Sequence, residues 1–457
     1  MRPLQNADVK ICCAPGSPQQ WRFPWGYQVA ILLLLAGCDG KPVHLPLARR
    51  PGIGAGQQRR LSTDEARLYG DTSELMAYHA DIEVGTPGQL LSVIVDTGSS
   101  RTAFPCSDCE NCGSHMDPPF SPSASSTFRW VGCAESGCSS CLNNSCSYTA
   151  KYVEGSSIEG KYFKDVLHLG VSERENDKSV VRMGCHTRET GLFKTQVPSG
   201  IMGLRDGDWN VLSQLADGHV HKKLFALCLA EHGGSFSMGE VNSTWMPTTG
   251  PWQWVPYTKA YYVDMDSVTM AGHNIFNEPL GSFLVDSGTT YTYFTSRQAL
   301  ALENQIRDFC KAGACGSAKM PTRSCYEASD DDLDKFPDLH LSFGSANYTW
   351  PARGYLYRRS GNWWCYSFFG MPPLTLGASF MRNHAIVFDQ DAKRIGFATS
   401  ACPEFVTRAE PEARASVGVT KHGPSTSFLG QLNSAHQHAA SLLVVLGALI
   451  SSLAQVA

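Results

Sequence analysis

Neither a strong net charge nor a run of basic residues marks this sequence of 457 residues. Its formal net charge is only −4, and no basic stripe alternates with aromatic residues, which argues against nucleic acid as a partner. Long apolar runs are also scarce. The run 29–37 is too short to cross a bilayer comfortably, so we interpret residues 1–38 as a signal peptide or signal anchor with a long lead.

Cysteine, by contrast, is abundant. Of 17 cysteines, all but three lie between Cys106 and Cys402, which leaves an even number for the globular part. This favours disulfides formed in the secretory pathway. The three-residue spacing in the Cys-rich insert 106–146 also suits a zinc site, but we prefer disulfides and expect no metal. Three glycosylation sequons, which begin at Asn143, Asn242 and Asn347, agree with that compartment.

Two further segments are expected to lie outside the globular body. Residues 39–75 are polar and aperiodic, and we interpret them as a pro-segment or flexible lead. Residues 403–438 form a linker rich in Pro, Ser, Gly and His. The final segment, 439–457, carries no charge from Ala440 onward. Eighteen residues of helix span about 27 Å, so this segment predicts a transmembrane anchor or a signal that is exchanged for a lipid.

The middle of the chain predicts an all-β body. Its length and its apolar content of 42% allow two lobes, which we place at 76–242 and 243–402. Short strands separated by Gly and Pro are predicted at 80–84, 91–95, 163–169, 281–285 and 385–388. Helices are expected only at 296–309 and 211–215. The acidic trio 330–332 is expected to be a solvated loop rather than a metal site.

One internal repeat determines the predicted architecture. An apolar strand followed by Asp, a hydroxyl residue, Gly and two more hydroxyl residues occurs at 91–100 and again at 282–290. A second echo relates 200–204 to 374–377, where apolar residues precede a glycine. Each half of the chain therefore holds the same two pieces, which indicates two related lobes.

Each copy of the repeat can hold a carboxylate at the tip of a tight turn. Two such loops that face each other bring two carboxylates together, and the two groups then share one proton because both cannot ionise cheaply. The charged group can deprotonate a water while the neutral one protonates a carbonyl, without a metal, cofactor or covalent intermediate. The predicted catalytic pair is Asp96 and Asp286, with the loop residues Thr97, Gly98, Ser99, Ser287, Gly288 and Thr289.

These motifs resemble the pepsin-like aspartic protease family. The resemblance runs from about Tyr78 to Cys402 and rests on Val-Asp-Thr-Gly-Ser-Ser at 95–100, Val-Asp-Ser-Gly-Thr-Thr at 285–290 and Leu-Gly-Ala-Ser-Phe-Met-Arg-Asn at 376–383. It implies a bilobal β fold with a peptide-binding cleft between the lobes and a flap over the cleft. It also implies a disulfide between Cys325 and Cys365.

Within this family the chain looks most like plasmepsin V and related secretory-pathway maturases, and its Cys-rich insert resembles that of the nepenthesins. The matching stretches are Phe-Pro-Cys at 104–106, Cys-Gly-Ser-His-Met-Asp-Pro-Pro-Phe at 112–120, Tyr-Val-Glu-Gly-Ser at 152–156 and Met-Gly-Cys-His at 183–186. The phrase Pro-Ser-Ala-Ser-Ser-Thr at 122–127 resembles the nepenthesins.

By that resemblance Tyr152 is the flap tyrosine, although a strand tyrosine that packs on the core is the alternative. Glu154 falls where the plasmepsin V group holds a substrate arginine, and an exposed glutamate without a role is the alternative. Two residues depart from the family pattern. Ala103 replaces the tryptophan that pepsins place seven residues after Asp96, and Val153 replaces a cysteine frequent in plasmepsin V.

Three functions follow as hypotheses. The preferred one is a monomeric, membrane-bound maturase of the endoplasmic reticulum or Golgi that cleaves secretory cargo at Arg-x-Leu sites. The second is a lipid-anchored or secreted protease of broad specificity at the cell surface. The third is a pepsin-like fold without activity that serves as a binding module, which usually requires a change at one Asp or the following Gly. Both motifs are intact here.

Overall fold

The computed structural model describes residues 64–169, 179–216, 220 and 222–405. All of them belong to the unit Leu61–Ala457. The predicted signal segment and C-terminal anchor lie outside the described residues, as do most of the predicted lead and linker. Within the described part, no helix is long and apolar enough to cross a membrane.

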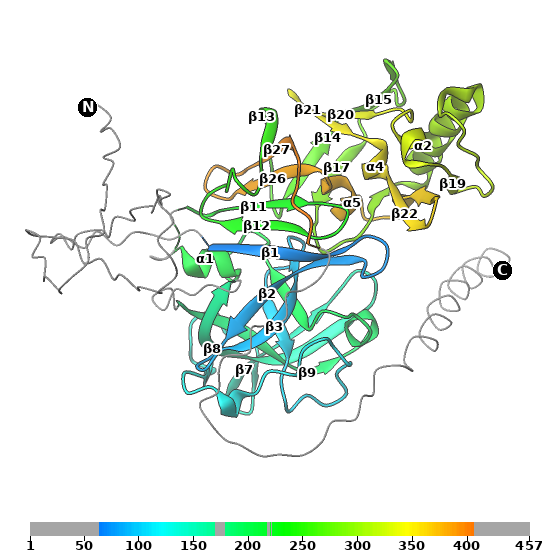
Figure 1. Cartoon of the computed structure of the whole chain (residues 1–457). Helices are drawn as coiled ribbons and strands as arrows, with labels where there is room; N and C mark the ends of the chain where they lie inside the picture. The colour runs from blue at the N-terminus through cyan, green and yellow to red at the C-terminus, as the bar shows by residue number, and fades with distance from the viewer. Residues whose placement is uncertain (1–63, 170–178, 217–219, 221, 406–457) are drawn as a thin grey trace, which may run out of the picture. The chain divides into compact units, whose positions relative to one another are not determined.

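A sheet of 15 strands forms the centre of the fold (Figure 1). On one side of β1 (Asp64–Asp71) the order is β12 (Gly234–Met238), β11 (Leu224–Leu229), β26 (His384–Asp389), β27 (Arg394–Ser400) and β13 (Thr248–Pro256). On the other side it is β2 (Ala77–Val84), β3 (Gln89–Asp96), β10 (Gly200–Gly203), β4 (Thr102–Pro105), β9 (Ser179–Glu189), β8 (Ser157–Leu169), β7 (Ser145–Lys151) and β6 (Cys141–Leu142). The short β5 (Arg129–Trp130) pairs with β8.

The later half of the chain adds three smaller sheets. The first contains β14 (Tyr262–Met265), β17 (Gly281–Val285), β25 (Thr375–Leu376), β18 (Thr292–Phe294) and β24 (Phe368–Gly370). The second contains β16 (His273–Asn274), β15 (Ser267–Met270), β20 (Leu339–Phe343) and β21 (Ala346–Trp350). The third contains β19 (Cys325–Glu327), β23 (Trp363–Tyr366) and β22 (Leu356–Ser360). Strands of both predicted lobes thus share the central sheet, which is the bilobal all-β fold expected.

Helices are short and few among the described residues. The longest is α2 (Ser296–Phe309), which begins with a capping box between Thr295 and Gln298. The others are α1 (Val211–Leu215), α3 (Asp330–Leu333), α4 (Ala352–Tyr355), α5 (Ala378–Met381), η1 (Pro122–Ala124), η2 (Gly191–Lys194) and η3 (Cys310–Ala314). The predicted helices at 296–309 and 211–215 are confirmed, and the five predicted strands lie within β2, β3, β8, β17 and β26.

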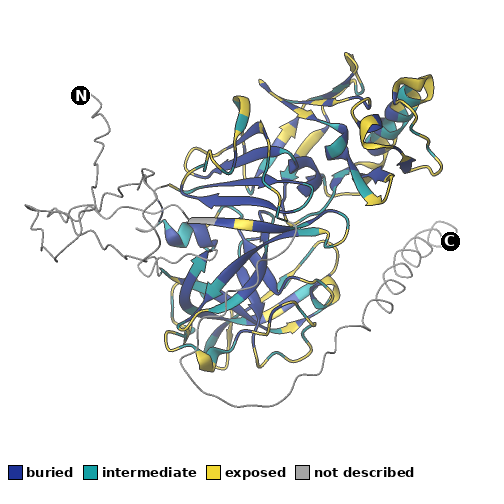
Figure 2. Cartoon of the chain, in the orientation of Figure 1, coloured by how far each residue is buried: buried dark blue, intermediate teal, exposed yellow. Residues whose placement is uncertain are grey.

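Strand β1 differs from the expectation that residues 39–75 form a lead outside the body. It pairs with β2 and β12, and its residues Ala66 and Leu68 are buried in the main core. Charged residues and a glycine occupy most of its other positions, so its short alternation gave no clear sequence signal. Figure 2 shows that strands of the central sheet are largely buried while the loops carry most of the exposed surface.

The acidic trio agrees only in part with the expectation of a solvated loop: Asp330 and Asp331 are exposed, but the trio lies in the short helix α3. Asp332 is buried and accepts hydrogen bonds from the hydroxyls of Ser317 and Ser329. Ser329 and Asp332 together form a capping box at the start of α3. Asp330 forms ion pairs with Arg353 and Arg358. Asp332 therefore caps the start of a helix through a local contact with Ser329, and Ser317 adds a hydrogen bond from farther along the chain.

Seven disulfides join the cysteines of the described part. Cys325 pairs with Cys365, as the family resemblance implied. The cysteines whose spacing also suits zinc are disulfide partners here. The remaining pairs are Cys106–Cys185, Cys109–Cys112, Cys133–Cys141, Cys138–Cys146, Cys228–Cys402 and Cys310–Cys315.

Candidate active site

Two equivalent strand pairs carry the predicted aspartates. Asp96 is the last residue of β3, and β10 runs parallel beside it, so that the N–H of Leu204 donates to the Asp96 carbonyl at 2.8 Å. Asp286 follows β17, and β25 runs parallel beside that strand, so that the Asp286 N–H donates to the Leu376 carbonyl at 3.0 Å. The second sequence echo is thus the neighbouring strand that supports each aspartate loop.

Hydrogen bonds between the two loops hold them face to face. The Thr97 hydroxyl donates to the carbonyl of Val285 at 2.8 Å and accepts from the Ser287 N–H at 3.0 Å. In return, the Ser287 hydroxyl donates to the carbonyl of Val95 at 2.6 Å and accepts from the Thr97 N–H at 3.2 Å. These four bonds are buried, so the two loops form one rigid unit although they lie 190 residues apart in the chain.

The two glycines allow the carboxylates to meet. A Cβ added to Gly98 would lie 2.6 Å from an Asp286 carboxylate oxygen, and one added to Gly288 would collide with the Asp96 carboxylate. The N–H of Gly98 donates to Asp96 at 2.7 Å, and that of Gly288 donates to Asp286 at 3.0 Å. Any larger residue at either glycine would therefore push the two carboxylates apart.

The carboxylates themselves are nearly buried, with 5% of Asp96 and 9% of Asp286 exposed. Burial, and then the charge of Asp286 and a hydrogen bond with it, raise the pKa of Asp96 well above its ordinary value. The Thr289 hydroxyl donates to Asp286 at 2.6 Å. Ser99 lowers the pKa of Asp96 in part, but its hydroxyl makes no hydrogen bond of acceptable geometry within the described part of the chain.

A hairpin turn between β7 and β8, residues 152–156, lies where the family places its flap. Tyr152 is half-buried, and burial together with the charge of Asp96 raises the pKa of its hydroxyl. Its ring packs against Phe193 of η2, with 4.7 Å between ring centroids. Phe193 and Ala103 belong to the same core cluster. Phe193 therefore serves as the aromatic partner of Tyr152 in a site that lacks the usual tryptophan, a role that no local sequence pattern indicated.

The other predicted site residues lie at the surface. Glu154 is exposed in the turn 152–156, and Val153 beside it is 81% exposed. Among the sequon residues, Asn143 and Asn347 are exposed. Asn242 is half-buried and its side-chain oxygen accepts from the N–H of Thr244 at 2.8 Å.

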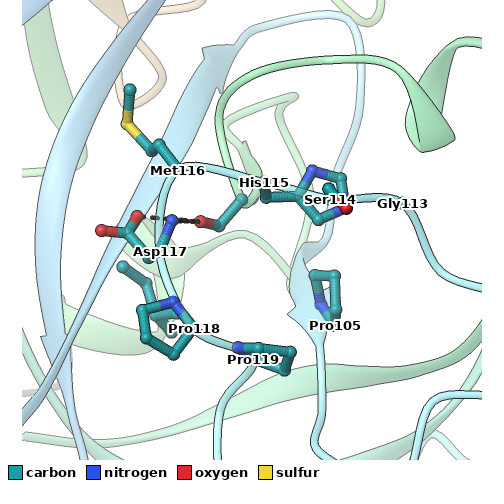
Figure 3. Close-up of a pocket in the computed structure, with 10 residues that line it drawn as sticks. Pro105, Gly113, Ser114, His115, Met116, Asp117, Pro118 and Pro119 are labelled. Carbon is teal, nitrogen blue, oxygen red and sulfur yellow. Dashed lines mark hydrogen bonds between the residues drawn. The ribbon is translucent and has the colours of Figure 1, made fainter. Parts of the chain in front are cut away.

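A pocket of about 490 Å³ opens elsewhere, beside the loop 113–119 (Figure 3). Its lining includes Leu91 at the opposite end of β3 from Asp96, so it lies apart from the aspartate pair. Pro105, Pro118 and Pro119 are among the lining residues labelled in Figure 3. Asp117 closes one side through hydrogen bonds with the Ser199 hydroxyl.

The sequence model of the eukaryotic aspartyl proteases matches residues 77–400. Together with the paired aspartate loops, this shows that the chain belongs to the pepsin-like aspartyl protease family, whose members are aspartic endopeptidases.

Three individual aspartic proteases are similar to most of this chain. Aspartic protease 5 of Toxoplasma gondii is 32% identical over 85% of this chain, and the match covers 43% of that protein. The chain thus spans less than half the length of this relative. Plasmepsin V of Plasmodium falciparum is 27% identical over 76% of this chain and 74% of its own length. Nepenthesin-1 of Nepenthes gracilis is 24% identical over 75% of this chain.

Proposed function

We propose that this protein hydrolyses peptide bonds with Asp96 and Asp286 as its general acid–base pair. The observation that carries the proposal is the mutual contact of two nearly buried carboxylates, held by the hydrogen bonds between Thr97 and Ser287. Because burial and the second charge raise the pKa of Asp96, the pair retains one proton.

The proton distribution determines the roles. Asp286 in its charged form accepts a proton from water, and the water oxygen bonds to the carbonyl carbon of the substrate. Asp96 in its neutral form donates its proton to the carbonyl oxygen, which gives a tetrahedral diol. The C–N bond then breaks as the amine takes a proton from the pair, and the other carboxylate receives one from the diol. Thr289 and the N–H groups of Gly98 and Gly288 stabilise the charge on the pair throughout.

We further propose that the substrates are secretory cargo proteins with Arg-x-Leu sites, cut by a membrane-bound maturase. The resemblance to plasmepsin V and the similarity to aspartic protease 5 support this role, and the seven disulfides agree with an oxidising compartment. Glu154 is exposed in the flap turn and forms no ion pair among the described residues, so its carboxylate is available to a substrate arginine. The uncharged segment 439–457 would provide the anchor.

A matched pair of peptides tests both levels of this proposal. One peptide carries Arg-x-Leu and the other has that Arg changed to Ala, and both are offered to the intact enzyme, Asp96→Asn and Glu154→Gln. We expect the intact enzyme to prefer the Arg peptide, Asp96→Asn to cut neither, and Glu154→Gln to lose the preference. Glu159→Gln is the control, because this exposed glutamate lies on β8 beyond the turn.

The other outcomes separate the competing functions. If the intact enzyme cuts both peptides equally, it is an aspartic protease of broad specificity and the maturase role is wrong. If it cuts neither peptide between acidic and neutral pH, the chain is an uncleaved zymogen or a binding module. Release of the protein from membranes by a phosphatidylinositol-specific lipase would identify a lipid anchor in place of a transmembrane one.

A further inference from the structure

A buried carboxylate that the proposed reaction does not use lies at the end of β9. The side chain of Glu189 has no exposed surface. One carboxylate oxygen accepts from Nδ1 of His186 at 2.7 Å. The other lies 3.2 Å from Nε2 of His115 and accepts from the N–H of Gly113 at 3.1 Å. An ionised group without solvent requires such partners, so these residues form a single buried network.

The network joins η2 to the loop that contains residues 113–116. His115 uses its second ring nitrogen to bond the carbonyl of Gln196 at 3.0 Å. Glu189 and Gln196 flank η2, so His115 bridges the two ends of this short helix. Because η2 has only four residues and is too short to be stable alone, it depends on this long-range contact within the chain.

The same segment holds the base of the flap. The N–H of Leu192 in η2 donates to the Ser156 hydroxyl at 2.9 Å. Thr190, directly after Glu189, donates its N–H to the carbonyl of Ser157 and accepts from the Ser157 N–H at 2.8 Å. Any displacement of η2 would therefore be transmitted to the turn 152–156.

A line of aromatic contacts continues from the network to the flap tyrosine. The His186 ring lies edge-on to Phe193, with 6.2 Å between centroids, and Phe193 packs against Tyr152 at 4.7 Å. His186 and Phe193 are buried, whereas Tyr152 is half-buried beside Asp96. Glu189 thus supports Tyr152 through the rings of His186 and Phe193, and Tyr152 is close enough to Asp96 for its pKa to be affected by that charge.

We infer that Glu189 is a positioning residue for the flap: with His115 and His186 it fixes η2 and Phe193, and so sets the position of Tyr152. This inference rests on the proposed function, because it assigns a role to the flap in binding substrate. It also explains how the site functions with Ala103 where pepsins have tryptophan: the support for Tyr152 comes from η2 instead.

The protonation states of the three groups are complementary. Burial alone would raise the pKa of Glu189, but the bonds from His115 and His186 lower it to about 2. Burial opposes the charge on His115, yet its bond to Glu189 and the charge of Glu189 raise its pKa above 6.5. Burial lowers the pKa of His186, whose Nε2 is buried without a hydrogen-bond partner among the described residues. At a pH between the lowered pKa of His186 and the raised pKa of His115, the network is therefore a charged His115–Glu189 pair beside a neutral His186.

The network should hold within a defined pH range. Because the folded pKa of His186 lies below 6.5, its contribution is lost as the pH falls through that lowered value. Because the folded pKa of His115 lies above 6.5, its contribution is lost as the pH rises through that raised value. Tyr148 also faces the cluster, with its ring 6.4 Å from His186, and burial raises the pKa of its hydroxyl, so it stays neutral.

Replacement of Glu189 by Gln tests this role. It preserves the shape of the side chain and removes the charge that His115 pairs with. We expect KM for the Arg-x-Leu peptide to rise about tenfold, the effect of one charge-assisted hydrogen bond, with kcat nearly unchanged. The range of pH over which KM is low should also narrow on its alkaline side, because His115 then loses its proton at a lower pH. His115→Gln should reproduce the rise in KM.

Asp165→Asn is the matched control. Asp165 is a buried carboxylate of β8 that binds Thr127, away from the flap turn. Its replacement should lower stability without changing KM. A rise in KM that is equal in Asp165→Asn and Glu189→Gln, or one below about twofold in Glu189→Gln, would show that the network is only structural.

A second readout does not depend on activity. Hydrogen exchange of residues 152–156 reports the opening of the turn, in which the Tyr152 N–H donates to the Ser156 carbonyl at 2.9 Å. We expect exchange about tenfold faster in Glu189→Gln than in Asp165→Asn. Unchanged exchange would overturn the inference even if the intact enzyme cuts the peptide. If exchange is faster in Glu189→Gln but the intact protein cuts no peptide, the positioning role would be supported and the proposed activity refuted.

Discussion

Replacement of Thr97 by valine tests whether the bonds between the two aspartate loops hold the site together. The Thr97 side chain is fully buried, and its hydroxyl joins the Val285 carbonyl and the Ser287 N–H. Valine has nearly the same shape but neither donates nor accepts. It would leave one buried carbonyl and one buried N–H without partners, at about 1–3 kcal/mol each. We therefore expect the free energy of unfolding to fall by about 2–6 kcal/mol.

Urea unfolding followed by tryptophan fluorescence measures this loss. Thr249→Val is the control, because Thr249 is exposed on β13 and its hydroxyl lies 3.5 Å from the Thr399 carbonyl. The control should change stability by no more than about 0.5 kcal/mol. In parallel, kcat of Thr97→Val should fall about a hundredfold, because the two carboxylates lose their fixed spacing. A loss below about 1 kcal/mol with kcat retained would refute the view that this residue joins the lobes.

Three further predictions concern single groups. Asp96→Asn should abolish cleavage yet stabilise the fold at pH 7, because the raised pKa of Asp96 means that the native state disfavours its ionised form at every pH above the ordinary pKa of an aspartate; a urea midpoint equal to that of the intact protein would contradict this. Burial lowers the pKa of His384 to about 4, so stability should decrease as the pH falls from 6.5 through about 4, by up to about 3 kcal/mol, and His384→Gln should flatten this decrease in urea midpoints measured across that range. Replacement of Cys228 and Cys402 by serine removes a disulfide that spans 174 residues, and the free energy of unfolding should fall by about 4–5 kcal/mol in thermal unfolding, because the unfolded chain is no longer constrained. A melting temperature equal to that of the intact protein would contradict this.

Local patterns were sufficient where one segment contains the whole signal. The capping residue and apolar spacing of α2 lie within its own sequence, so its bounds were predicted residue for residue. The loops around Asp96 and Asp286 are strand ends followed by a tight turn, which is again a local property. Strand β1 could not be predicted in this way, because its Ala66 and Leu68 become buried only when the strand pairs with β2 and β12.

Tertiary contacts decided what surrounds the aspartates. Thr97 was expected to be a loop residue, but its hydroxyl bonds lie across the interface between the halves of the chain. Phe193 was not anticipated as a partner of Tyr152, because ring packing between two segments leaves no periodic trace in either. Asp332 was expected in solvent, yet two serines that precede it in the chain bring it into the interior.

The sequence by itself determined the class of the protein and predicted its reacting pair. A repeated Asp-hydroxyl-Gly turn after an apolar strand is a short-range pattern, and short-range patterns can be read along the chain. Only the tertiary structure decided which disulfides form besides Cys325–Cys365, how Tyr152 is supported without a tryptophan, and that Glu189 lies between His115 and His186. The physical reason is that burial and partner choice arise from residues distant in sequence, and it is burial and partners that set the charge and position of each group.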